Sequence, residues 1–88
     1  MNKRDAQNIS DKIVAILKEE RIKKGISQYK LAKDTGMSKS SILYIENGKQ
    51  HPTLYTIILI SKYLNIEIGS VISSIENKTD EYEIINRN

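Results

Sequence analysis

The sequence contains no cysteine, which excludes a disulfide framework, a thiolate zinc site and a cysteine nucleophile. Its one histidine, His51, has no second histidine or carboxylate at a spacing that suits metal ligands, so we expect no bound metal. No Ser, His and Asp constellation, pair of catalytic carboxylates or glycine-rich phosphate loop stands out. We therefore expect neither an enzyme nor a cofactor.

Long apolar runs are missing as well. Runs such as Ile57 to Ile60 are far too short to cross a membrane. Lys3 and Arg4 imitate the basic start of a signal peptide, but Asp5 and Gln7 stand where its apolar run should follow. We therefore expect a soluble, cytoplasmic protein with no membrane contact.

The charge is distributed unevenly along the 88 residues, whose net charge is +3. Residues 1–50 carry eleven Lys or Arg against six Asp or Glu, a balance of +5, whereas residues 51–88 carry three against five, a balance of −2. A positive first half favours a nucleic-acid partner, although an ordinary solvated helix face has the same composition. The length indicates one domain with a core of marginal size, to which oligomerisation would add stability.

Two short helices joined by a tight turn are predicted within residues 27–49. Each has a serine as its N-cap and a glycine at or just after its end: Ser27 and Gly36 for residues 28–35, Ser38 and Gly48 for residues 39–46. Two helices of about two turns, separated by about three residues that include a glycine, match the helix-turn-helix unit. In that unit the second helix enters the major groove of DNA.

The spacing inside this unit also fits two crossing helices. Ala32 is small enough to let the backbones approach, and Ile42 and Ile45 point from one face of the second helix into the core. The alternative is an ordinary αα-hairpin of a helical bundle, which would carry these residues only by chance.

From Leu17 to Ile72 the chain resembles the phage-repressor and Cro-like helix-turn-helix domain, the Xre family of bacterial and phage regulators. The matching residues follow the family's order and spacing: Arg21, Gly25-Ile26-Ser27-Gln28, Leu31-Ala32, Gly36, Ser38, Ile42, Ile45-Glu46-Asn47-Gly48-Lys49, Pro52-Thr53-Leu54, Leu64 and Ile66. The resemblance implies an all-α, five-helix bundle of the lambda-repressor-like DNA-binding type. It also implies a sequence-specific transcriptional regulator, most commonly a repressor.

Periodicity predicts three further helices, over residues 11–24, 54–64 and 68–75, the second of them capped by Thr53. Residues 11–75 then form the domain, between a flexible arm at 1–10 and a polar, acidic tail at 76–88 that is either disordered or ordered by a partner. The side chains expected in the core are Ile13, Ile16, Leu17, Glu20, Leu54, Ile57, Ile60, Ser61, Leu64, Val71 and Ile72.

The outward face of the second helix of the unit is the candidate base-reading surface. At about 100° per residue, Lys39, Ser40, Leu43 and Tyr44 lie opposite Ile42 and Ile45. Lys39 can donate to guanine or to a phosphate, and Leu43 suits a thymine methyl, although a lone exposed leucine is also common. The resemblance places the family's base-reading positions at Lys39, Ser40 and Tyr44.

Other residues are expected to hold phosphates or to fix the geometry. Gln28 opens its helix beside exposed amides, and the resemblance implies that it grips a phosphate and braces the recognition helix. Tyr29 is a weaker candidate, since a packing role fits it equally well. Arg21 is either a surface arginine or, as the resemblance implies, the partner of Glu46 in a partly buried ion pair. The remaining candidates, in the cap and the loop of the recognition helix, are Ser38, Asn47, Lys49, Gln50 and His51.

Assembly into a homodimer on a pseudo-palindromic operator of double-stranded DNA is expected, because one recognition helix reads only a few base pairs. The resemblance implies contacts through the fifth helix and neighbouring segments. The alternative is that these side chains cover the core of their own chain. A second functional hypothesis keeps the fold but makes it an antitoxin or antirepressor-type module whose partner is a protein. The interface candidates are Tyr55, Leu59, Tyr63, Ile68 and Ile75, with Tyr82, Ile84 and Ile85 in the tail.

Overall fold

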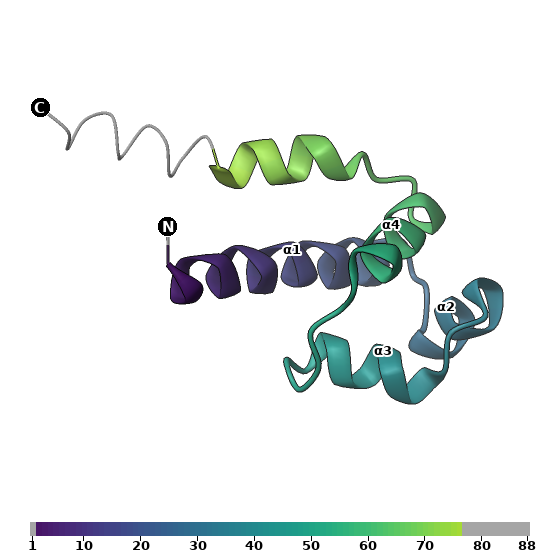
Figure 1. The fold of residues 1–88 in the computed structure, drawn as a ribbon. Coiled ribbons are helices and arrows are strands. Elements are labelled where there is room, and N and C mark those ends of the chain that lie inside the picture. Colours follow the sequence, from purple (N-terminus) through teal and green to yellow (C-terminus); the bar gives the residue numbers. More distant parts are fainter. Residues whose placement is uncertain (1, 77–88) are drawn as a thin grey trace, which may run out of the picture.

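The computed structural model describes residues 2–76, and the regular structure in this range is all helical. Four helices are followed by a fifth over Ile68–Glu76 (Figure 1): α1 (Lys3–Lys23), α2 (Gln28–Thr35), α3 (Lys39–Glu46) and α4 (Leu54–Tyr63). The predicted all-α fold of five helices is confirmed.

Helix α1 begins at Lys3, well before the predicted start at residue 11. A capping box closes its first turn, since the Asp5 amide donates to the Asn2 side chain (3.0 Å) and the Asn2 amide donates to the Asp5 carboxylate (3.2 Å). The prediction of a flexible, non-helical arm is therefore wrong for residues 3–10. These turns escaped the periodicity analysis because residues 3–8 are all exposed and show no buried stripe.

Helices α2 and α3 have the predicted bounds. The Ser27 hydroxyl accepts from the Lys30 amide and the Ser38 hydroxyl from the Ser41 amide, each at 3.0 Å. Gly36 ends α2 with a φ of +80°, a left-handed conformation that costs glycine little. The sequence signals for this pair of helices are thus confirmed one by one.

The core lies where α1, α2, α3 and α4 meet. All four helices contribute to its buried cluster, which consists of Leu17, Leu31, Ala32, Ile42, Ile60 and Leu64. Ser61 is also buried, with 2% of its surface exposed, as predicted for a core residue. Ile13 and Ile57 pack against the cluster but are only partly buried, and Val71 and Ile72 of the fifth helix are partly buried as well.

One predicted core residue faces solvent. Leu54 is the first residue of α4 and has 72% of its surface exposed. At about 100° per residue it lies roughly 80° around the helix from the buried Leu64, and a side chain in the first turn leans towards the helix N-terminus. The prediction that Leu54 lies in the core is therefore wrong.

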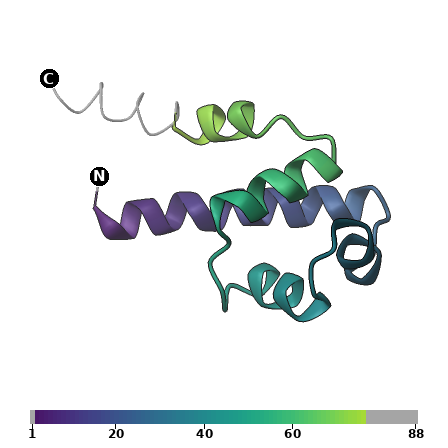
Figure 2. The ribbon, with the colours of Figure 1, turned by 45° about the vertical axis from the view of Figure 1, so that its right-hand side comes forward.

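The helices are arranged on two sides of α1. Both views place α2 and α3 on one side, and the fifth helix runs back alongside the N-terminal part of α1 on the other (Figures 1 and 2). No single helix among residues 2–76 is long and apolar enough to cross a membrane; α4 and the fifth helix meet the length and composition test only as a pair, bent by 115°.

Candidate nucleic-acid interface

Helix α3 has one buried face and one exposed face. Ile42 and Ile45 are buried, with 1% and 5% of their surface exposed. The residues predicted to point outward are all exposed, namely Lys39, Ser40, Leu43 and Tyr44. The division of this helix by angle is confirmed as far as exposure goes, and it presents one cation, a hydroxyl, a phenol and an aliphatic side chain on a single surface.

The end of α3 is tied to α1 by a bidentate ion pair. Arg21 donates from Nε to Glu46 Oε2 (2.7 Å) and from a terminal nitrogen to Glu46 Oε1 (2.8 Å). Its other terminal nitrogen donates to the Ile26 carbonyl at 2.6 Å. Arg21 is 8% exposed, so the alternative of a surface arginine is wrong and the pair with Glu46 is present.

Glu46 also receives a hydrogen bond from the first residue of α2. The Gln28 amide nitrogen donates to Glu46 Oε1 at 3.0 Å, which braces α3 as the family resemblance implies. Burial alone raises the pKa of Glu46, but the hydrogen bonds from Arg21 and Gln28 and the charge of Arg21 outweigh it. The pKa of this carboxyl therefore lies below its ordinary value, and Glu46 is ionised at neutral pH.

The loop after α3 is fixed to that helix by its own backbone. The amides of Lys49 and Gln50 both donate to the Tyr44 carbonyl, at 2.8 and 3.2 Å. The side chains of Asn47, Lys49 and Gln50 are all exposed. The candidate phosphate contacts of this loop therefore extend from an anchored backbone rather than from a free segment.

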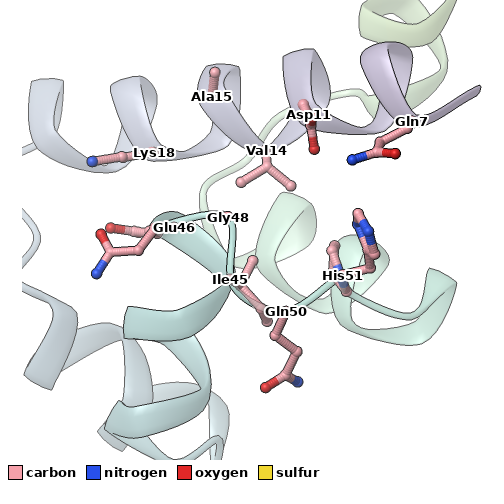
Figure 3. A pocket seen from close by; sticks show the side chains of 12 residues that line it. Gln7, Asp11, Val14, Ala15, Lys18, Ile45, Glu46, Gly48, Gln50 and His51 are labelled. Carbon is pink, nitrogen blue, oxygen red and sulfur yellow. The ribbon is translucent and has the colours of Figure 1, made fainter. Parts of the chain in front are cut away.

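An open groove of about 350 Å³ separates this loop from α1 (Figure 3). Gln7 and Asp11 point into it from α1, while Gln50 points away from α1. The sequence analysis predicted most of this α1 wall as helix but missed the part at Gln7, which it placed in a flexible arm. The capping residues Asn2 and Asp5 were the signal that could have revealed this wall.

The candidate residues of the dimer interface differ in how far they are buried within their own chain. Tyr55 is 74% exposed, whereas Leu59, Ile68 and Ile75 are partly buried. Tyr63 packs against the core, and its hydroxyl donates to the Asp34 carboxylate, which also accepts from Lys30 at 2.9 Å. The candidates in the tail, Tyr82, Ile84 and Ile85, lie outside the described residues.

Tyr29 is 64% exposed and is therefore not the packing residue of the alternative interpretation. Among residues 2–76, no group of three or more His, Asp or Glu side chains is arranged to hold a metal ion.

The comparisons with known proteins agree with this geometry. A family model described as helix-turn-helix matches residues 17–71, which is more than half of the chain. The chain belongs to the helix-turn-helix family. The matched region contains the ion pair, α2, α3 and α4, whereas the first turns of α1 lie outside it.

Three curated relatives show the extent of the similarity. The chain is 28% identical over 65 residues to the cryptic phage CTXphi transcriptional repressor RstR of Vibrio cholerae, covering 74% of this chain and 59% of that protein. It is 33% identical over 58 residues to the ImmF control region 10 kDa protein of Bacillus phage phi105, covering 66% and 64%. It is 35% identical over 52 residues to an uncharacterized HTH-type transcriptional regulator of Archaeoglobus fulgidus, covering 59% and 74%. The first two matches thus span less than two thirds of those proteins, and no solved structure matches the chain.

Proposed function

We propose that this helix-turn-helix protein binds double-stranded DNA in a sequence-specific manner and represses transcription. The proposal rests on the way α3 is held in the domain. Ile42 and Ile45 on one face of α3 are buried in the core, and Glu46 at its end is bonded to Arg21 and Gln28. Its outward residues form an exposed surface that fits a major groove about 12 Å wide. The relative named a transcriptional repressor supports the direction of regulation.

The base contacts are assigned to the outward surface of α3. Lys39 is suited to guanine O6 and N7 or to a phosphate, and Ser40 can donate or accept a hydrogen bond. Tyr44 offers both a hydroxyl and an apolar ring, and Leu43 offers only an apolar contact for a thymine methyl. We therefore assign recognition of the base sequence to these four side chains of α3.

The phosphate contacts are assigned to the two ends of the unit. Gln28 and Ser38 stand at the N-termini of α2 and α3, and the N-terminus of a helix favours an anion. Asn47 and Lys49 extend from the anchored loop at the other end. Gln28 then serves both as brace, through Glu46, and as phosphate contact. The proposal needs no cofactor and no catalytic residue.

A single α3 reads only a few base pairs, and helix-turn-helix proteins generally place two such helices in successive turns of the major groove. We therefore propose a homodimer on a pseudo-palindromic operator. The exposed apolar side chains of α4 support this part of the proposal.

Selection of bound DNA from a random pool, followed by shift assays at two salt concentrations, tests the proposal. We expect one sequence to be enriched. We also expect log K to fall linearly with the logarithm of the salt concentration, with a slope of about −0.9 for each phosphate contact. If no sequence is enriched and no binding is detected at low salt, the DNA-binding proposal is rejected. The antitoxin or antirepressor-type module, with a protein partner, would then replace it.

A further inference from the structure

The groove between α1 and the loop after α3 is lined on its α1 side by one stripe of that helix. Gln7, Asp11, Val14 and Lys18 recur at spacings of three or four residues. At about 100° per residue they lie within an arc of roughly 60°. None of the DNA contacts proposed above involves these four residues, so the groove is a candidate site of its own.

The stripe carries opposite charges at its two ends. Asp11 points into the groove, and Lys18 lies next to Glu46 at the other end (Figure 3). Arg21 already balances the charge of Glu46, so the ammonium of Lys18 is the surplus charge there. Seven residues of helix place the Cα atoms of Asp11 and Lys18 about 10 Å apart. Within residues 2–76, neither of these two side chains makes a hydrogen bond or an ion pair.

Between the two charges the groove is apolar. Val14 points into it from α1, and Ile45 and Pro52 line it as well (Figure 3). Its volume of about 350 Å³ is at the lower end of the usual range for ligand sites, about 300–1,000 Å³. Such sites bury about 70–90% of a small molecule, whereas an open groove leaves much of it in water. The shape therefore favours a segment of a larger protein, which other contacts help to hold.

We infer that the groove binds a short segment of a partner protein that carries a basic and an acidic side chain with an apolar side chain between them. The basic side chain pairs with Asp11 and the acidic one with Lys18, while the apolar one contacts Val14. In an extended segment, three residue steps of about 3.3 Å cover the distance between the two charges. A segment with like charges at its two ends meets repulsion at one end of the groove.

A segment in the groove leaves the proposed DNA contacts uncovered. Gln50, a candidate contact in the loop, points away from α1, whereas the groove lies on the α1 side of that loop (Figure 3). The partner can therefore be held by the domain while DNA is bound. This consequence rests on the proposed function, whereas the binding of the segment does not.

Amide NMR spectra of the whole chain, titrated with capped four-residue peptides, test the inference. With the peptide Arg-Val-Ser-Glu we expect saturable shifts at Asp11, Val14 and His51, which line the groove. The peptides Arg-Val-Ser-Arg and Glu-Val-Ser-Glu should bind about fivefold more weakly, because each places one like charge at an end of the groove. Equal affinities for the three peptides, or shifts spread over the whole domain, would overturn the inference.

Substitutions of the two charges give the matched comparison. Asp11→Asn and Lys18→Gln should each weaken binding of Arg-Val-Ser-Glu about fivefold. The controls are Lys12→Gln and Glu19→Gln, because both residues are exposed charges of α1 that do not line the groove. These controls should change the affinity by less than about twofold, and circular dichroism checks that all four variants keep their helices. Equal losses in all four variants would overturn the inference.

The same spectra distinguish two other occupants. If capped arginine alone binds as tightly as the peptide, the groove takes a free cation and not a protein segment. If the same amides shift when the concentration of the chain alone is raised, a second copy fills the groove. Either result would overturn the inference.

Shift assays separate this inference from the proposed function. We expect saturating peptide, and likewise Asp11→Asn, to change the affinity for selected DNA by less than about twofold. Peptide binding in the groove by a chain that binds no DNA would reject the proposed function and keep the groove site. DNA binding by a chain whose groove binds none of the peptides would reject the groove site and keep DNA binding.

Discussion

Glu46 holds three helices together at a single carboxylate. It is the last residue of α3, and it accepts hydrogen bonds from Arg21 of α1 and Gln28 of α2. The side chains of Arg21 and Glu46 are only 9% and 7% exposed. Because burying two charges costs about as much as their attraction returns, such a pair contributes more to geometry than to net stability. Its role is to fix the orientation of α3 against the rest of the domain.

Removing one member of this ion pair should destabilise the fold, even though the pair itself adds little net stability. Arg21→Ala leaves the Glu46 carboxylate buried without its main partner, and we expect the free energy of unfolding to fall by about 3 kcal/mol. Lys23→Ala is the control, because its pair with Glu20 is exposed and should contribute less than about 1 kcal/mol. Denaturant melts of both variants make the comparison, and equal losses would contradict this account of Arg21.

The same carboxylate makes stability depend on pH in a definite direction. The pKa of Glu46 is lowered in the folded protein, so the folded state releases its proton more readily than the unfolded chain. The resulting stabilisation is fully present above the ordinary value of about 4.5 and is lost as the pH falls through the lowered pKa. We expect the stability difference between the unmodified chain and Glu46→Gln to shrink between pH 6 and pH 3. A difference that stays constant over this range in denaturant melts would remove Glu46 as the cause.

At the scale of elements, local signals predicted α2 and α3 well because serine caps and glycine ends act within a few residues. The start of α1 was missed, since its first turns are exposed and carry no buried stripe, although Asn2 and Asp5 form a capping box. The buried state of Arg21 came from the family resemblance, not from its spacing, because burial depends on contacts with residues far along the chain. The exposure of Leu54 was missed because periodicity alone does not show how far around α4 the core extends at its first turn.

Mutations in the two elements proposed to face DNA, α3 and the loop after it, should have different effects on DNA binding. Lys49→Ala removes a charge from the anchored loop, and we expect weaker binding to all DNA with a salt slope smaller by about one. Lys39→Ala on α3 should instead change which sequences are preferred, with a loss of about 1 to 3 kcal/mol for the specific site if its contact is to a base. Shift assays on specific and random DNA distinguish the two. If Lys49→Ala alters sequence preference and Lys39→Ala does not, the assignment of contacts is wrong.

For the whole molecule, the positive balance of residues 1–50 lies on the part of the chain that contains α1, α2 and α3. The sequence predicted this placement, because charge counts need no tertiary information. It did not predict the base sequence of the operator, since Lys39, Ser40 and Tyr44 each have more than one possible partner in the groove.

The proposed homodimer, with two recognition helices, gives a prediction about its proposed operator. Two inverted half-sites separated by about one helical turn, 10 base pairs or 34 Å, place both major grooves on the same side of the duplex. Adding about five base pairs between them turns the second half-site to the opposite side, where the partner chain cannot reach it without breaking the dimer. We expect the second protomer to bind at least tenfold more weakly to this DNA, and binding to recover when about ten base pairs are added instead. Titrations on the three duplexes, with a single half-site as the control, measure the effect. Equal affinity for the second protomer on all of them would show that the two chains bind independently.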